Sequence, residues 1–406
     1  MPKANSQPTD DSTGRFKERQ AQIVMEAISI LNKKGIASMM MSDVAAQLEL
    51  APTAVFYYYK NKEDLAAACM KSGLARFHTM IDAVESVEEP DRVRAFVNHY
   101  FAQLQLIAEG KAPALPLFNE IRALSDEAVN KEYVRMFKRL RGLVDASAPT
   151  KLGRLDRNIR THQLLTQILW ADTWVKRYEP GEFARLAKRF YDILANGYLK
   201  GEAPKGLPRA KPVNRVLNVE DAGTERILQT ATQLINTRGY KSASIEKIAA
   251  RLSLTKGAVY YHYASKEDLA KACFDRSVDL ILNAKAVGDK DGQTASDRLI
   301  ITLSLLMEHQ LDKNVPIIRL SALASMPREL RIKVYNRFEK LTLGFASLIS
   351  DGIADGSMRA IDPFVGASIM TGVLMAATEA QFWATDLTAK NVSKLYVRPV
   401  ILGSLV

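Results

Sequence analysis

The chain of 406 residues is long enough for two or three domains, and its hydrophobic content of 47% and charged content of 25% are those of ordinary folded proteins. Its 56 basic residues outnumber 45 acidic ones, and the formal charge of +11 suits an anionic partner, although a merely basic soluble protein shows the same balance. The longest uncharged run, 363–378, is too short to span a bilayer, so the composition argues against a membrane protein.

The first 60 residues predict a tail followed by a small helical domain. Residues 1–14 are rich in Pro, Asn, Ser and Asp and predict a flexible tail. From residue 15 the chain is basic, and apolar residues at helical spacing predict a helix that stops at Gly35. Two short helices follow, and Pro52 suits the first position of the second one because that position needs no amide donor. We expect a helix-turn-helix domain over 15–61, whose second short helix would enter the DNA major groove.

Residues 62–202 predict a helical core, because apolar residues recur at helical spacing between breaks at proline and glycine. We expect helices near 62–87, 91–109, 114–124, 126–145, 151–178 and 181–199. Residues 203–220 combine four prolines or glycines with basic residues and lack a helical period, so they predict an extended linker.

The rest of the chain repeats the first half. Adding 204 to each number from Ile23 to Cys69 gives an ungapped match with 20 of 47 positions identical, which indicates duplication of a whole domain. The second helix-turn-helix domain then covers 221–265 and the second core 266–406. We expect core helices near 266–287, 295–312, 315–324, 327–350, 362–385 and 388–404. Extended alternation of apolar and polar residues is absent, so the predicted fold is all-α, with two tandem units.

The second copy carries complete helix-start signals. Ser244 and Thr255 each precede a short apolar-periodic helix, and Ser265 with Asp268 forms a capping box that opens the next, longer helix. The two cysteines of the chain, Cys69 and Cys273, occupy the same position in the two copies, which favours small buried packing residues over a disulfide or a metal site.

Residues 223–273 resemble the DNA-binding domain of the TetR family of bacterial transcriptional regulators. The resemblance lies in a hydroxyl residue followed by Lys-Gly, a Tyr-Tyr-His run and a Ser-Lys-Glu corner. It implies that the start of the second helix, the aromatic run and the corner lysine approach double-stranded DNA. In the second copy these residues are Thr255, Lys256, Gly257, Tyr260, Tyr261, His262 and Lys266. In the first copy they are Pro52, Thr53, Tyr57, Tyr58 and Lys62.

The first copy departs from the family pattern. Ala51 replaces the hydroxyl cap, Pro52 and Thr53 replace Lys-Gly, and Tyr58 replaces His. Loss of a cap costs about 1 kcal/mol, and loss of phosphate donors weakens binding to every DNA sequence, so we expect the second copy to dominate. For the corner lysines, ordinary solvated residues are the alternative to phosphate contacts. We assign the apolar or aromatic residues that close each small core to packing: Val55, Tyr59, Val259 and Tyr263.

Three tryptophans, Trp170, Trp174 and Trp383, lie in the penultimate predicted helices of the two cores. Anchoring of a core or an interface is the simpler interpretation, because aromatic residues dominate both. The run from Trp170 to Trp174 also resembles the penultimate helix of TetR regulators that sense acyl-CoA thioesters, which implies contact with a ligand.

Signatures of enzymes, cofactor sites and metal sites are missing. There is no phosphate-cradling glycine loop, nucleophile elbow, His-Glu-x-x-His or zinc spacing. We expect a cytoplasmic regulator without cofactor that binds an operator. The resemblance implies a repressor, because most members of the family repress transcription. We expect a small hydrophobic effector to release it from DNA, and an acyl-CoA thioester is one candidate. The alternative is a sensor in which only the second copy reads DNA and the first is a covalently attached dimerisation partner.

The tandem arrangement also predicts the state of assembly. An 18-residue linker at 203–220 reaches about 60 Å when extended, which is enough for the two cores to pack side by side. Tethering favours pairing within a chain over pairing between chains. We therefore expect a single-chain pseudo-dimer, with a homodimer of four DNA-binding domains as the alternative.

Overall fold

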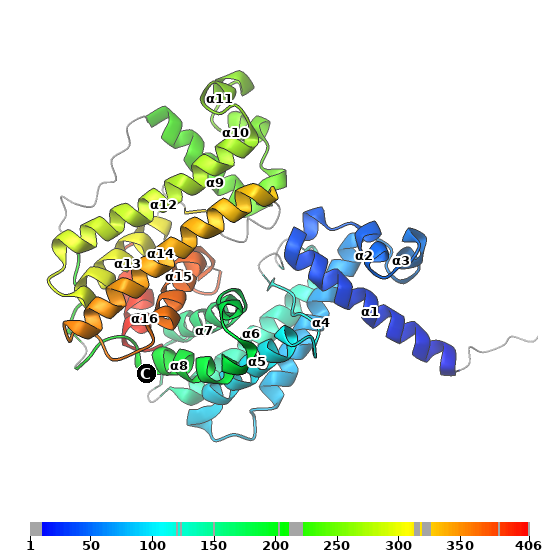
Figure 1. The fold of residues 1–406 in the computed structure, drawn as a ribbon, viewed down its shortest axis with the longest axis horizontal. Helices are drawn as coiled ribbons and strands as arrows, with labels where there is room; N and C mark the ends of the chain where they lie inside the picture. Colours follow the sequence, from blue (N-terminus) through cyan, green and yellow to red (C-terminus); the bar gives the residue numbers. More distant parts are fainter. Residues whose placement is uncertain are drawn as a thin grey trace, which may run out of the picture. The chain divides into compact units, whose positions relative to one another are not determined.

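The computed structural model describes residues 10–118, 121, 124–148, 151–201, 204–210, 222–311, 317–318, 326–380 and 382–404. Across these residues the chain is built from helices (Figure 1). Its β structure, within the same residues, amounts to one isolated antiparallel bridge between Leu199 and Met358. The predicted all-α fold is confirmed. Among the helices so described, none is long and apolar enough to cross a membrane.

The chain divides into two compact units. The first unit contains Met1–Thr79 and Gly110–Met136, and the second contains Met80–Glu109 and Phe137–Val406. In the first unit lie α1 (Asp10–Lys34), α2 (Met41–Gln47), α3 (Pro52–Tyr58), most of α4 (Lys62–Asp82) and the start of α6 (Glu127–Ser147). The division runs through the first sequence repeat, so the domain boundaries taken from the repeat remain a prediction.

The second unit holds the remaining helices of the first repeat and the whole described second repeat. The helices of the first repeat here are α5 (Arg92–Ala108), α7 (Arg154–Trp174) and α8 (Phe183–Asn196). Those of the second repeat are α9 (Ala222–Ser242), α10 (Ile245–Arg251), α11 (Lys256–His262), α12 (Lys266–Asp291), α13 (Ala295–Leu311), α14 (Arg328–Ala354), α15 (Pro363–Ala380) and α16 (Arg398–Leu402), the last preceded by a π-helical turn (Ser393–Val397).

The start of the first helix differs from the expectation, whereas its end before Gly35 agrees with it. Helix α1 begins at Asp10, five residues before the predicted start, because Gly14 is tolerated inside it at the cost of its low helix propensity. The rest of the predicted tail, residues 1–9, lies outside the described residues, as do 203 and 211–220 of the predicted linker. Residues 204–210 are described and contain no helix, as expected for a linker.

The helix predicted near 114–124 is wrong for the residues that can be compared. Residues 111–117 are irregular, and Phe118 and Ile121 have a 3₁₀ conformation. A side chain forms hydrogen bonds with the backbone of this loop. The Arg76 guanidinium donates to the carbonyls of Pro113 (2.7 Å) and Ala114 (3.0 Å). Pro116 also fills the space above Gly73, where a Cβ would lie 2.3 Å from its Cγ. Long-range contacts therefore replace the helix.

The last predicted helices are shorter than expected. Helix α15 ends at Ala380, and the segment predicted as one helix over 388–404 consists of turns, the π-helical turn and α16. Pro399 stands in the first turn of α16, where a missing amide is tolerated. Most of the helix predicted near 315–324 lies outside the described residues, and Ile317 and Ile318, which are described, are not helical.

Inside the second unit, the final helices of the two repeats pack together. Helix α7 lies against α15, and α8 also contacts α15. The segments at the ends of α8 and α16 form backbone hydrogen bonds with each other. Tyr198 N–H donates to the Ile401 carbonyl (2.8 Å), and Ser404 N–H donates to the Leu194 carbonyl (2.7 Å). This exchange has the reciprocal form of an interface between two related subunits.

Glycines make the exchange possible. Gly197 and Gly403 have φ of 64° and 115°, in the region that L side chains rarely adopt. A Cβ on Gly197 would lie 2.2 Å from the Ile401 carbonyl oxygen, and a Cβ on Gly403 would lie 2.2 Å from the Ala195 carbonyl oxygen. Each glycine therefore lets one repeat's backbone approach the other's.

Candidate DNA-binding surfaces

The second helix-turn-helix is formed by α10 and α11 and the turn between them. Ser244 accepts a hydrogen bond from Lys247 N–H (3.4 Å), and Thr255 accepts one from Ala258 N–H (3.2 Å), so both predicted caps are present. Ser253 bends the turn with a φ of 56°. Val259 is completely buried and fixes the inner side of α11 against the domain. We call residues 222–265 the second head.

The outer side of α11 presents the residues expected to meet DNA. Tyr261 is 87% exposed and Tyr260 is 42% exposed. The other exposed members of the predicted set are Thr255, Lys256, Gly257 and His262. The His262 ring nitrogen Nδ1 lies 3.3 Å from the Thr224 hydroxyl on α9, which ties the end of α11 to the first helix of the head. The geometry therefore brings the predicted residues onto one accessible face.

Lys256 forms an ion pair with Glu246, a residue of α10. The hydrogen bond from Lys256 is the largest cause that lowers the pKa of Glu246 to about 2, and the same bond raises the pKa of Lys256. Both groups are therefore charged at neutral pH. The Lys256 ammonium also lies 5.6 Å from the centre of the Tyr260 ring. The sequence analysis missed Glu246, because its meeting with Lys256 depends on the turn between the helices.

Lys266 is held in place by an aromatic ring. Its ammonium lies 4.5 Å from the centre of the Tyr240 ring, and Tyr240 donates its hydroxyl hydrogen bond to Glu267 (2.9 Å). Burial lowers the pKa of Lys266 below its ordinary value. This lysine is half-buried at the head–core corner, so the interpretation of a freely solvated side chain does not fit, and its contact with phosphate stays a prediction.

The first head, residues 15–61, has the same helices and a different surface. Within the described residues, Met40 and Ala51 precede α2 and α3 without a side-chain capping bond, and Pro52 takes the first turn of α3 as predicted. Tyr57 is 75% exposed, and Pro52 and Thr53 are exposed beside it. Glu49 takes the turn position of Ser253, with a φ of 54°.

Two residues predicted to contact DNA in the first head are partly covered. The Tyr58 ring lies 4.7 Å from the ring of Phe16 on α1, measured between centroids. Tyr58 and Lys62 are both half-buried. The ammonium of Lys62 lies 4.0 Å from the Glu63 carboxylate. Their contacts with DNA remain predictions, with less accessible surface than Tyr57 offers.

Each head is held by hydrogen bonds from an asparagine at the same position of the repeat. In the first unit, Asn32 donates to the Leu115 carbonyl (2.8 Å) and accepts from Leu117 N–H (2.9 Å). In the second unit, Asn236, which is 204 residues further on, donates to the Ile317 carbonyl (2.8 Å). Each asparagine lies on the first helix of a head and binds backbone groups outside that head. Its identity in both copies was the signal that the sequence analysis did not use.

The second head has an additional link that the first lacks. Arg276 on α12 donates from Nε to both carboxylate oxygens of Glu225 on α9 (2.8 and 2.9 Å). Gln229 also donates to this carboxylate (2.8 Å). At the corresponding positions the first copy has Ala21 and Ser72. Of these two pairs of positions, only the pair in the second copy joins head and core by an ion pair.

The three tryptophans lie where the helices of the two repeats meet inside the second unit. Trp170 donates its indole N–H to the Ser368 carbonyl (2.9 Å). The Trp383 ring stacks on Phe137 at 3.6 Å and 4°. Trp174 is buried among Phe101 and Phe190, and its indole nitrogen has no hydrogen-bond partner among the described residues. Contact with an effector stays a prediction for all three.

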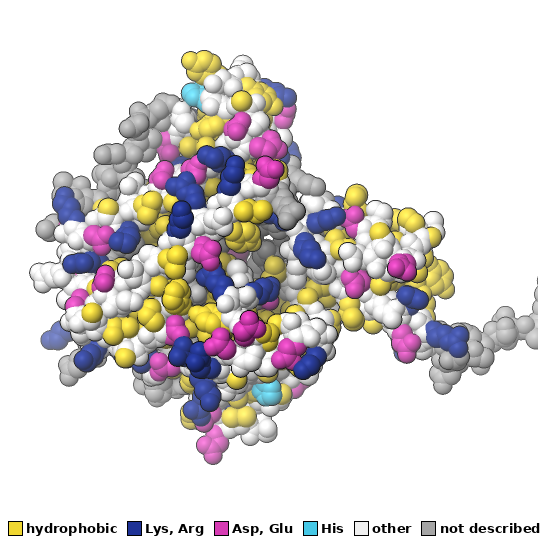
Figure 2. Space-filling view, viewed as in Figure 1, with side chains coloured by type: hydrophobic (Ala, Val, Ile, Leu, Met, Phe, Trp, Pro, Cys, Tyr) yellow, Lys and Arg dark blue, Asp and Glu magenta, His cyan; other side chains and the backbone are white. Residues whose placement is uncertain are grey.

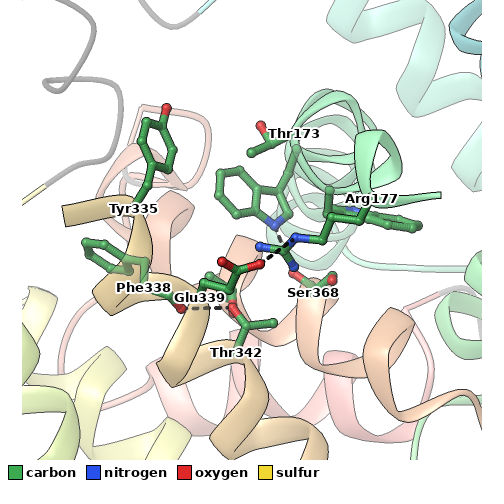
Figure 3. A pocket seen from close by; sticks show the side chains of 10 residues that line it. Thr173, Arg177, Tyr335, Phe338, Glu339, Thr342 and Ser368 are labelled. Carbon is green, nitrogen blue, oxygen red and sulfur yellow. Dashed lines mark hydrogen bonds and ion pairs between the residues drawn. The ribbon is translucent and has the colours of Figure 1, made fainter. Parts of the chain in front are cut away.

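A small cavity of about 30 Å³ lies beside Trp170 and Trp174 (Figure 3). Tyr335, Phe338 and Glu339 of α14 face Thr173 and Arg177 across it, and the Arg177–Glu339 ion pair (3.4 Å) spans it. This volume accommodates a water-sized molecule. An acyl chain would enter here only if α7, α14 and α15 moved apart.

The charges on the visible face of the second unit are mixed. Figure 2 shows Lys and Arg side chains interspersed with Asp and Glu over α9, α12 and α14, without a continuous stripe of one sign. Helix α12 carries ion pairs of opposite charge four residues apart, Lys271–Asp275 and Lys285–Asp289. On this face, the net positive charge of the chain does not itself mark out a binding surface.

Comparison with known families decides the relationship. The model of bacterial regulatory proteins of the tetR family matches residues 23–69 and again residues 227–273, which cover α2, α3, α10 and α11. The chain is a TetR-family regulator with two TetR-like copies. The predicted resemblance is therefore confirmed for both helix-turn-helix domains.

The relatives of this TetR-family chain differ in how much of the chain they match. YuxN of Bacillus subtilis, an uncharacterised HTH-type transcriptional regulator, is 32% identical over 21% of this chain, and the match spans only 30% of YuxN. YxbF of the same organism is 20% identical over 74% of this chain and 77% of YxbF. The structure of AibR in complex with isovaleryl coenzyme A and operator DNA is 26% identical over 44% of this chain and 97% of AibR, with a TM-score of 0.38.

Proposed function

We propose that this TetR-family chain represses transcription by binding operator DNA through two unlike heads, as a single-chain pseudo-dimer. The observation that carries the proposal is the exposed face of α11, where Lys256, Tyr260 and Tyr261 project from a helix that Thr255 caps and Val259 anchors. A short, rigidly held second helix of this kind enters the major groove, while hydroxyl and basic side chains around it contact phosphates.

The second head is the stronger DNA reader in this proposal. It keeps side-chain caps on α10 and α11, whereas α2 and α3 start without them. It also keeps Lys256 where the first head has Pro52. The same differences favour the alternative function, in which the first copy is a covalently attached partner without contact to DNA. Substitution of each head in turn separates the two.

The pseudo-dimer is supported by the packing of the two repeats inside the second unit. Helices α7 and α8 lie against α15, and the hydrogen bonds between the ends of α8 and α16 are reciprocal. Further bonds cross between the repeats, from Gln163 to the Tyr396 carbonyl (2.7 Å) and from Tyr198 to the Gly366 carbonyl (2.9 Å). Helix faces that are covered within one chain are not available to pair with a second chain.

Replacing Lys266 with Ala should weaken binding to operator and to random DNA alike. If its ammonium contacts phosphate, the slope of log affinity against log salt should fall by about 0.9, the value for one released counterion. Replacing Lys256 with Ala should instead reduce the ratio of operator to random affinity. Fluorescence anisotropy at several salt concentrations measures both effects.

Lys285→Ala is the matched control for these two variants. Lys285 also lies on α12 and pairs with Asp289 (2.7 Å), away from the head. It removes the same charge and should leave the salt slope unchanged. Loss of binding by the control, or unchanged binding by both Lys256 and Lys266 variants, would contradict the assignment of the second head.

We propose that the effector is a small hydrophobic molecule that binds in the helical cores near the tryptophans, with acyl-CoA thioesters as the first class to test. The support is the aromatic cluster of Trp174, Phe101 and Phe190 in the first repeat, together with the resemblance of 170–174 to acyl-CoA sensors. Binding there should part α7 from α14 and α15 and change how the two repeats pack.

An acyl-CoA effector should quench tryptophan emission, raise the melting temperature and release DNA. Ligand present at 100 times its Kd should stabilise the protein by about 2.7 kcal/mol. Trp174→Phe or Trp383→Phe should blunt the quench, and Trp174→Phe should do so more strongly because Trp174 lines the cavity. A panel of acyl-CoA thioesters that leaves melting temperature and DNA affinity unmoved would exclude this class.

A further inference from the structure

The two heads expose different chemistry at matching positions of their helix-turn-helix motifs, α2–α3 and α10–α11. In the second head the exposed pair is Lys256 with Glu246. In the first head the same two positions are Pro52 and Ser42, so the cation and its carboxylate are absent together. Phe56, which takes the place of Tyr260, is 51% exposed and lacks the hydroxyl group.

These differences match the groups that bases present in the major groove. Guanine offers the acceptors O6 and N7, which lysine favours, and cytosine offers an N4 amino donor, which a carboxylate accepts. Thymine offers a methyl group, which apolar side chains contact. A lysine and a carboxylate held side by side therefore fit a G·C pair, and a proline with a phenylalanine fit thymine methyl groups.

We propose, resting on the function proposed above, that the operator has two chemically unlike half-sites. Lys256 and Glu246 of the second head read a G·C pair. Pro52 and Phe56 of the first head read thymine methyl groups. Both heads keep the corner lysine, Lys62 or Lys266, which we expect to contact phosphate. The two heads therefore share this contact and differ in the residues that read bases.

The ion pair gives Glu246 a specific part in this reading. Lys256 and Glu246 come from different helices, and their side chains are 53% and 57% exposed. A free carboxylate on this face would repel phosphate and disfavour every sequence. Paired with Lys256, it orients the ammonium and leaves an oxygen for a cytosine amino group. Glu246 thus selects against DNA that lacks the G·C pair.

Base analogues test each half of the proposal with the full-length chain. Selection from random duplexes defines the operator, and single bases are then replaced by analogues that preserve pairing. Replacing thymine with uracil in the first head's half-site removes one methyl group and should lower affinity about fourfold for each contacted methyl. Replacing guanine with 7-deazaguanine in the second head's half-site removes the N7 acceptor and should lower affinity about tenfold.

Variants show which head senses which analogue. Lys256→Ala should abolish sensitivity to 7-deazaguanine while keeping sensitivity to uracil. Phe56→Ser should do the reverse, and the exposed position of Phe56 lets the domain fold with the smaller side chain. Glu246→Gln should raise affinity for random DNA at least severalfold and lower the specificity ratio.

The outcomes separate this inference from the function on which it rests. Failure of the chain to bind any duplex would overturn both. Specific binding to a palindromic site, or to a site that one head alone contacts, would overturn the unlike half-sites and leave DNA binding intact. Equal sensitivity of wild type and variants to both analogues would likewise overturn the assignment of Lys256 and Phe56.

Discussion

Replacing Arg276 with Met should destabilise the second head by about 3–5 kcal/mol, the cost of leaving one member of a buried ion pair without its partner. The side chains of Arg276 and Glu225 are 7% and 15% exposed, so water cannot replace the lost hydrogen bonds. Because the pair joins α9 to α12, we expect the loss to be local. Amide hydrogen exchange of α9 measures this opening free energy directly.

The first copy supplies the control for this experiment. It has Ala21 and Ser72 where the second has Glu225 and Arg276, and its α1 and α4 form without the pair. The double replacement Glu225→Ala with Arg276→Ser should therefore cost less than the sum of the two single replacements. Additive losses would show that the two side chains contribute independently and would contradict the coupling.

Replacing Tyr198 with Ala should open the contact between the repeats. The ring is fully buried, its hydroxyl donates to the Gly366 carbonyl (2.9 Å), and a cavity of this kind costs about 3–5 kcal/mol. Tyr198→Phe keeps the packing and loses one hydrogen bond, at about 1 kcal/mol. Thermal unfolding of the second unit should therefore shift strongly for Ala and weakly for Phe.

Tyr191→Ala tests whether this effect belongs to the contact between the repeats. Tyr191 lies on the same helix, α8, and is only half-buried. Its replacement should produce a smaller shift. Equal shifts for Tyr191→Ala and Tyr198→Ala would mean that α8 is destabilised as a helix, and the special role of the Tyr198 contact would be wrong.

The sequence predicted the parts of the molecule that depend on local chemistry. Ser244, Thr255 and Ser265 act as caps because their hydroxyl groups reach amides three residues away. Cys69 and Cys273 are buried and form no disulfide, as predicted for small packing residues, and burial raises both pKa values to about 12. The exposed aromatic face of α11 followed from the same short-range pattern.

Features that depend on distant residues could not be predicted. Residues 114–117 belong to a segment predicted as a helix, yet Asn32 and Arg76 hydrogen-bond to its backbone from helices far back in the chain. The stacking of Trp383 on Phe137 joins residues of different repeats. The Lys256–Glu246 pair depends on how the turn sets α10 against α11, which the spacing alone does not fix.

The central claim is that one chain with two unlike heads binds one operator. Light scattering coupled to size exclusion, run on the free protein and on its complex with the selected duplex, tests it most directly. We predict a free particle of one chain, 45.1 kDa, and a complex of one chain per duplex with a non-palindromic site. A stable particle of two chains on a palindromic site would contradict the claim and indicate a homodimer with four heads.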